Sequence, residues 1–258
     1  MKKLRIKRPD IKAAVLILLL SSCSAKEETF AAPPSEQLYS TPYGTFPVIE
    51  EIWQKNEYML AHPSHPGDEL CTAYLTDDPG NADAVRAELA ALADEITAGC
   101  GTELEKAEAL AMWTGTNIAY DFDSADESGG LSVMTAEAVL RDRRTTCTGF
   151  ANLFMCLCAA EDIYCLFIMG GSASGGWQRN ELTEAPANHA WNAFCADGQW
   201  YFADPAWIGD LSYENGRVFG GENILPFYAR FGFGEMCTEH RIDRCEYMDV
   251  FDRNIYED

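Results

Sequence analysis

TTCTGFANLFMCLC, residues 145–158, contains three of the ten cysteines of the chain. Its apolar side chains recur at three- and four-residue spacing: Phe150, Leu153, Phe154 and Leu157. This spacing predicts a helix with one buried side. A thiol is nucleophilic only as the thiolate, and the free N–H groups of a first helical turn lower its pKa. Cys147 stands where this helix should begin, whereas Cys156 and Cys158 fall in its interior and are expected in the core.

A reactive thiolate needs a base, and the chain has four histidines. His62 and His65 lie in a proline-rich loop, and His240 lies in a tail without a clear period. His189 begins HAWNAFCA, whose alternation predicts a strand. His189 is therefore the candidate base.

A third group must accept the other imidazole N–H to fix the orientation of the ring. QWYFADPAW, residues 199–207, repeats the alternating pattern after the turn residues Asp197 and Gly198, which predicts an antiparallel hairpin. Asp204 lies at the end of its second strand. Pairing within one hairpin is expected to bring this carboxylate beside His189.

These residues resemble the three core motifs of the transglutaminase-like superfamily, which shares the papain-like thiol-enzyme fold: Cys147 in TTCTGFANLF, His189 in NHAWNAF and Asp204 in YFADPAW. MWTGTNIAYDFD, residues 112–123, resembles the helix-and-tyrosine segment that precedes the nucleophile in bacterial members. The resemblance spans about residues 104–210. It implies that Cys147 is the nucleophile, His189 the base and acid, and Asp204 the orienting carboxylate.

The sequence departs from the family pattern around the nucleophile. Members usually have glycine two residues before the cysteine, where this chain has Thr145. They often have Gly-Tyr-Ala after it, where this chain has Gly149, Phe150 and Ala151. Thr145 is expected to crowd the approach of a substrate to the thiol.

The resemblance implies acyl transfer at an amide carbonyl, through a thioester on Cys147. The oxyanion is expected to be held by the Cys147 N–H and by either Trp113 or Tyr120. Trp191 and Trp207 flank the predicted site and either line a substrate groove or belong to the core. Three functions stay open: hydrolysis of peptide or other amide bonds in the cell envelope, cross-linking by transamidation, and a catalytically silent binding module.

Helical patterns precede strand patterns along the chain, which predicts an α+β fold with helices packed on an antiparallel sheet. The predicted division is a signal peptide over 1–22, a flexible tether over 23–47, a helical region over 48–102, the transglutaminase-like core over 103–210 and a C-terminal extension over 211–258. The extension is aromatic and charged without a clear period, so no elements are assigned to it.

The first residues have the pattern of an export signal. A basic leader, MKKLRIKRPDIK, is followed by the short apolar run AAVLILLL. The tetrapeptide from Leu20 to Cys23 resembles the lipobox of bacterial lipoproteins, in which the cysteine is acylated. This implies lipidation of Cys23 and an extracytoplasmic protein held at the cell membrane. An ordinary signal peptide or an uncleaved anchor is the alternative.

Charge and cysteine spacing restrict the partners. The 19 basic against 41 acidic residues give a net charge of −22, which makes nucleic acid an implausible partner. The expected partner is a peptide or protein substrate, and no cofactor is predicted. His62, His65, Asp68 and Cys71 match no common metal spacing, so no metal site is predicted. Disulfides such as Cys71–Cys100 or Cys237–Cys245 stay open, as does the oligomeric state.

Overall fold

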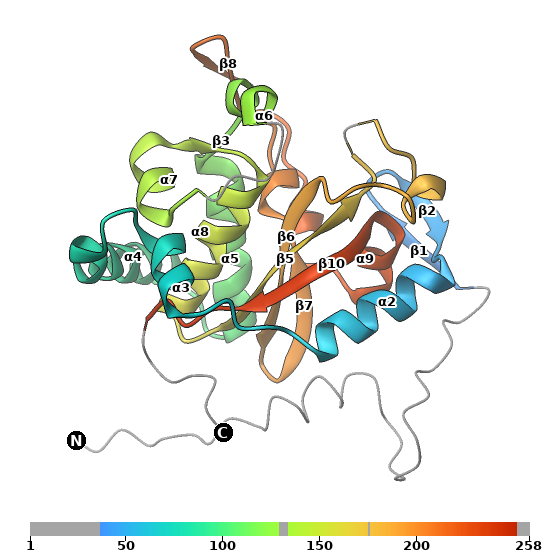
Figure 1. Ribbon diagram of the computed structural model, residues 1–258, viewed down its shortest axis with the longest axis horizontal. Coiled ribbons are helices and arrows are strands. Elements are labelled where there is room, and N and C mark those ends of the chain that lie inside the picture. Colours follow the sequence, from blue (N-terminus) through green and yellow to red (C-terminus); the bar gives the residue numbers. More distant parts are fainter. Residues whose placement is uncertain (1–36, 129–133, 175, 252–258) are drawn as a thin grey trace.

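A computed structural model of the chain describes residues 37–128, 134–174 and 176–251. The predicted signal peptide and Cys23 lie outside these residues. The centre of the fold is an antiparallel sheet with the strand order β10 (His240–Tyr247), β5 (Tyr164–Ser172), β6 (His189–Ala196) and β7 (Gln199–Ala203). The predicted hairpin is β6 and β7, paired from Asn192 with Ala203 to Ala196 with Gln199. The predicted α+β class is confirmed (Figure 1).

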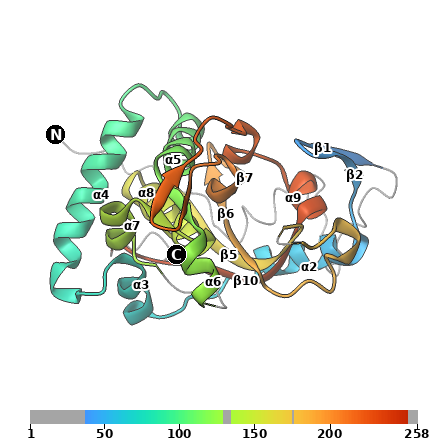
Figure 2. The same ribbon diagram turned by 90° about the horizontal axis from the view of Figure 1, so that it is seen from above.

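Helices lie on both sides of this sheet. The helices of the described residues are α2 (Glu50–Ala61), α3 (Asp68–Leu75), α4 (Ala82–Thr97), α5 (Glu103–Asn117), α6 (Phe122–Ser128), α7 (Ala136–Asp142), α8 (Cys147–Ala160) and α9 (Phe233–Glu239). Figures 1 and 2 show α4, α5, α7 and α8 gathered on one side of the sheet, with α2 and α9 on the other. Helix α8 packs directly on β5 and β6.

Shorter elements complete the fold. A second sheet has the order β4 (Arg144–Thr145), β3 (Ala119–Asp121), β8 (Ser212–Glu214) and β9 (Arg217–Phe219). The 3-10 helices are η1 (Pro79–Asn81), η2 (Arg179–Glu181), η3 (Pro205–Trp207) and η4 (Pro226–Ala229). Strand β3 runs parallel to β4 and pairs Tyr120 with Thr145. This pairing holds Tyr120 next to the first residues of α8.

Helix α8 is more buried than its sequence pattern indicates. The spacing predicts one buried side, but every residue from Cys147 to Ala159 is buried. The sheet covers one side of the helix, and α4, α5 and α7 cover the rest. A helix that is apolar around its whole circumference is typical of such a central position.

Two segments contain strands that the sequence analysis does not assign. Residues 38–47, which the sequence assigns to the tether, form a hairpin of β1 (Leu38–Thr41) and β2 (Gly44–Pro47). The C-terminal extension supplies β10, which pairs with β5 in the central sheet. Within the described part of the chain, no helix combines the length and apolarity needed to cross a membrane.

The pairings Cys71–Cys100 and Cys237–Cys245 are not formed, because all four of these cysteines are free thiols. Cys156 and Cys158 are fully buried in α8, as expected of core residues. Burial raises the pKa of both thiols, so neither is activated.

Thr145 and Gly149 fit together at the start of α8. Thr145 is fully buried, and a Cβ added to Gly149 would lie 2.0 Å from its Oγ1 and 2.8 Å from its Cβ. The expectation that Thr145 crowds the approach to the thiol is therefore wrong. Its side chain occupies the space that the glycine leaves open inside the protein.

We predict that Gly149→Ala lowers the free energy of unfolding by about 1–3 kcal/mol, because the new methyl group overpacks against Thr145. In an unobstructed helix interior, replacing glycine by alanine raises the free energy of unfolding by about 0.5–1 kcal/mol. Urea unfolding followed by circular dichroism measures the difference. The matched control is Gly149→Ala in a Thr145→Gly background, where the loss should be smaller. A gain in stability on Gly149→Ala alone would contradict this packing.

Candidate active site

Cys147 is the first residue of α8, where the sequence places it. Thr146 precedes the helix in an extended conformation, and its carbonyl accepts the N–H groups of Gly149 and Phe150. As an N–H of the first helical turn, the Cys147 N–H has no acceptor within the helix, and it donates to the Tyr120 hydroxyl. The Cys147 side chain is buried, with 3% of its surface exposed. The thiol thus lies at the positive end of a helix, next to the sheet.

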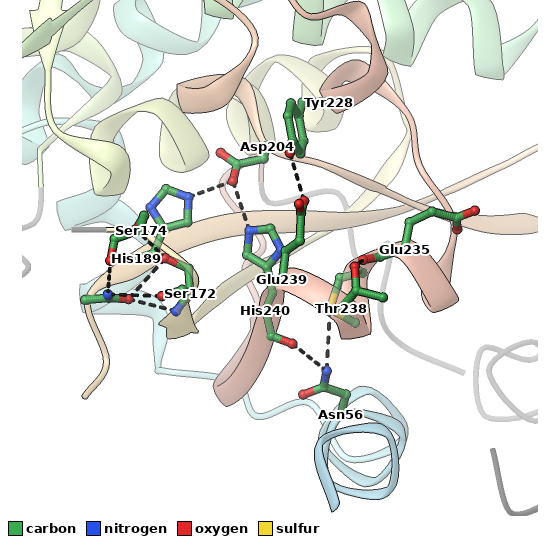
Figure 3. Close-up of polar contacts among 12 residues, drawn as sticks. Asn56, Ser172, Ser174, His189, Asp204, Tyr228, Glu235, Thr238, Glu239 and His240 are labelled. Atoms are coloured by element: carbon green, nitrogen blue, oxygen red, sulfur yellow. Dashed lines mark hydrogen bonds and ion pairs between the residues drawn. The ribbon is translucent and has the colours of Figure 1, made fainter. Parts of the chain in front are cut away.

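His189 and Asp204 form the contact that the sequence predicts. The His189 Nε2 lies 2.6 Å from Asp204 Oδ2, and both side chains are buried (Figure 3). An ionised carboxylate only accepts hydrogen bonds, so Nε2 carries the hydrogen. The His189 ring also forms a side-chain hydrogen bond with Cys147. Because Nε2 is occupied by Asp204, Nδ1 is the nitrogen that remains for the sulfur.

His189 stabilises both Cys147 and Asp204 as anions, and they stabilise it as a cation. Burial opposes ionisation of the Cys147 thiol, but the hydrogen bond and charge of His189 and the Ala190 N–H outweigh it, so its pKa is lowered. Burial likewise disfavours a charged His189, but Asp204 and Cys147 raise the pKa of the imidazole to about 10. The pKa of Asp204 is lowered because His189 and a second histidine, His240, outweigh its desolvation. The favoured state is a thiolate and an imidazolium beside a carboxylate.

Tyr120 and Trp113, the two oxyanion candidates, lie in different places. The Tyr120 hydroxyl interacts with both the thiol and the backbone of Cys147. Burial, with the nearby charge of Cys147, raises the pKa of this hydroxyl, so it stays a donor at neutral pH. Trp113 instead lies under Arg143, whose guanidinium carbon is 5.1 Å from the centre of the Trp113 ring. Tyr120 is therefore the candidate that reaches the nucleophile.

Trp191 and Trp207 also lie in different environments. Trp191 is fully buried and packs on the His240 ring at 4.6 Å, so it is a core residue and does not line a groove. Trp207 is half-buried and stacks on His189 with ring centres 5.1 Å apart. Trp207 also lines a pocket of about 460 Å³ together with Tyr43, Ile208 and Leu225. The Trp207 side chain therefore connects this pocket to the imidazole, although His189 itself does not line it.

Asn192 ties the nucleophile helix to the sheet. Its Nδ2 donates to Ala151 O of α8 at 3.0 Å and to Leu166 O of β5 at 3.1 Å. Asn192 is fully buried on β6, three residues after His189. One side chain thus fixes the distance between the helix that carries the sulfur and the strand that carries the imidazole.

The sequence analysis did not place His240 at the site, because this histidine lies in the C-terminal segment to which no elements are assigned. His240 is the first residue of β10 and is fully buried. Its Nε2 lies 3.2 Å from the same Asp204 oxygen that binds His189. A local signal existed, because the apolar and polar residues of HRIDRCEY partly alternate. That pattern does not say which strand is the partner, so it could not place the imidazole at the site.

Several known proteins are similar to part of this chain. A model of the transglutaminase-like superfamily matches residues 90–205. The chain is 28% identical over 127 residues to kyphoscoliosis peptidase of Mus musculus and 29% identical over 120 residues to that of Homo sapiens. These matches cover 49% and 46% of this chain but only 19% and 18% of the two relatives. Hillarin of Drosophila melanogaster is 29% identical over 119 residues, or 45% of this chain and 14% of hillarin.

Two solved structures are similar to part of this chain. One is of a proposed cysteine protease from Cytophaga hutchinsonii, with 16% identity and a TM-score of 0.37 over 70% of this chain and 62% of that one. The other is of a TGase, with 14% identity and a TM-score of 0.37 over 69% of this chain and 46% of that one.

The family match is the finding that bears on identity, because Cys147, His189 and Asp204 all fall within the matched segment. The predicted α+β fold with helices packed on an antiparallel sheet is confirmed. Residues 90–205 of this chain are therefore similar to the transglutaminase-like superfamily.

Proposed function

We propose that this protein is a thiol enzyme that hydrolyses peptide or other amide bonds through Cys147, His189 and Asp204. The observation that carries the proposal is the continuous contact from the buried sulfur through the imidazole to the carboxylate. The name of two relatives, kyphoscoliosis peptidase, points to the same chemistry. Because the matches span less than a fifth of those proteins, this chain's substrate is inferred from its own site.

In the first half of the reaction, the Cys147 thiolate attacks the amide carbonyl carbon and a C–S bond forms. The carbonyl oxygen becomes an oxyanion, which the Cys147 N–H and the Tyr120 hydroxyl are placed to stabilise. The His189 imidazolium gives its proton to the nitrogen as the C–N bond breaks. An amine leaves, and the acyl group remains on sulfur as a thioester.

In the second half, water attacks the thioester and His189, now neutral, takes its proton. The C–S bond breaks, a carboxylic acid leaves and the thiolate and imidazolium are restored. Asp204 remains a carboxylate throughout and stabilises the imidazolium in each half. The pocket beside Trp207 and Tyr43 is where we place the substrate segment next to the scissile bond.

The lowered pKa of Cys147 predicts that its thiolate persists below neutral pH. Iodoacetamide should alkylate Cys147 at pH 6 at nearly its rate at pH 7.5, because the ion pair with His189 holds the thiolate. A free cysteine, with a pKa of about 8.5, loses roughly tenfold in rate per pH unit in this range. Peptide mapping by mass spectrometry gives the rate at each thiol. Cys156, fully buried in the same helix, is the internal control, and labelling of Cys147 no faster than of Cys156 would favour the silent binding module.

The products distinguish hydrolysis from transamidation. Incubation with a peptide mixture and a labelled primary amine should give new carboxyl and amino termini and little incorporated label. Cys147→Ala should abolish product formation. Asp204→Asn keeps the shape of the side chain but not its charge, so kcat should fall about 10³- to 10⁴-fold. Label incorporated in preference to hydrolysis would identify a transamidase instead.

We further propose that the enzyme acts outside the cytoplasm and is held at the membrane by lipid on Cys23. The basic leader, the apolar run and the lipobox-like tetrapeptide support this placement. In a bacterial host fed an alkyne-bearing fatty acid, the full chain should carry the label and sediment with membranes. Cys23→Ala should lose both properties. Retained label in this variant would contradict acylation at Cys23.

A further inference from the structure

Two imidazoles share the oxygen Asp204 Oδ2. The His189 Nε2 lies 2.6 Å from this atom and the His240 Nε2 lies 3.2 Å from it (Figure 3). The other carboxylate oxygen, Oδ1, is buried with no hydrogen-bond partner. His240 thus supplies one of the two side-chain hydrogen bonds of a fully buried carboxylate. We propose that His240 is a positioning residue, which keeps Asp204 ionised and aimed at His189; the inference rests on the function proposed above.

The register of the sheet explains how the two imidazoles meet. His240 of β10 pairs with Ser172 of β5, and His189 of β6 pairs with Gly170 of β5. The two histidines therefore stand on the strands that flank β5, at the same end of the sheet. Their ring centres are 5.8 Å apart. Asp204 follows β7 and reaches the space in front of both rings.

A helix on the far side of the sheet fixes the His240 backbone. Asn56 of α2 donates from Nδ2 to His240 O at 2.9 Å and accepts the Ile242 N–H at 2.6 Å through Oδ1. This pair of bonds imitates a neighbouring strand at the point where β10 begins. The His240 ring is packed against Trp191 at 4.6 Å and Trp207 at 4.7 Å. With none of its surface exposed, His240 acts through Asp204 and not on a substrate.

The hydrogen of His240 is fixed by its partner. Because the carboxylate only accepts, Nε2 of His240 must be the protonated nitrogen. Nδ1 of His240 is buried and has no hydrogen-bond partner. The His240 ring therefore donates from Nε2 to Asp204.

Other ionisable groups around Asp204 do not compete in the acid range. The phenols that face it stay neutral there, since burial raises the pKa of each: Tyr43, Tyr120 and Tyr228. Glu239, the neighbour of His240 in sequence, is ion-paired with Arg179 and accepts the Tyr228 hydroxyl at 2.8 Å. The charge balance at Asp204 is therefore set by His189, His240 and Cys147.

The same three side chains, His189, Asp204 and His240, are close enough to suggest a metal site. The distances favour shared hydrogen bonds. Zinc binds nitrogen and oxygen at about 2.0–2.2 Å in a tetrahedron, which separates neighbouring ligand atoms by more than 3 Å. The 2.6 Å between His189 Nε2 and Asp204 Oδ2 is shorter than that separation and matches a charge-assisted hydrogen bond.

The test compares His240→Phe, which keeps a ring but no donor, with His240→Gln, which keeps an N–H. The readout is the pH at which Cys147 alkylation by iodoacetamide falls to half its maximum. The pKa of Asp204 is lowered in the folded protein, so the carboxylate is lost as pH falls through that value, and the imidazolium loses its partner. Without the His240 donor, that loss should occur at higher pH. We expect an upward shift of about one pH unit in His240→Phe and a smaller shift in His240→Gln.

If His240 had only a structural role, the two variants would yield less folded protein, but the midpoint pH of Cys147 alkylation in each would equal that of the wild type. This result would overturn the proposal. Loss of wild-type reactivity on dialysis against EDTA would also overturn it, in favour of a metal site.

A second readout does not depend on thiol chemistry. The His189 Nε2 proton, held in a short bond to a carboxylate, should give a low-field NMR signal that vanishes when Asp204 is protonated. Its midpoint should also rise in His240→Phe, and an unchanged midpoint would overturn the inference. If wild-type Cys147 is unreactive while this midpoint still shifts, the proposed function fails and the role of His240 stands.

Discussion

The site depends on one buried negative charge. Asp204 has no exposed surface, and an isolated carboxylate in such a place would take up a proton. It stays ionised because His189 and His240 donate to it from two different strands. Removing one partner of a buried ion is costly, so the carboxylate also constrains where β6 and β10 lie. The same charge raises the pKa of His189, and the hydrogen bond and charge of His189 in turn lower the pKa of the Cys147 thiol.

The surrounding architecture serves to keep these groups at fixed distances. Helix α8 carries the sulfur and is buried on all sides, with Asn192 bonding it to the sheet. Gly149 lets Thr145 turn inward, so the residue that departs from the family pattern does not obstruct the thiol. On the opposite face, Asn56 of α2 fixes the start of β10. The chemistry therefore draws on elements from both sides of the sheet.

Local patterns were enough to predict the core of the site. The start of α8 at Cys147 and the hairpin carrying His189 and Asp204 follow from short-range periodicity, and the three motifs together led to the superfamily. His240 could not be placed, because β10 pairs with β5, a strand that lies far back in the sequence. Trp191 and Trp207 look equivalent in sequence, yet only the packing around them separates a core side chain from a pocket wall. The hairpin over residues 38–47 lies in a polar, proline-bearing segment whose sequence pattern did not reveal the two strands.

The central claim is that the fold holds Cys147 as a thiolate paired with the His189 imidazolium. The most direct measurement is a pH titration of thiolate ultraviolet absorbance, taken as the difference between the wild-type chain and Cys147→Ser. If the pair is present, the titration will show one thiolate already at neutral pH, and this thiolate will disappear only in acid. A signal that first appears near the pKa of an ordinary thiol, about 8.5, would contradict the central claim.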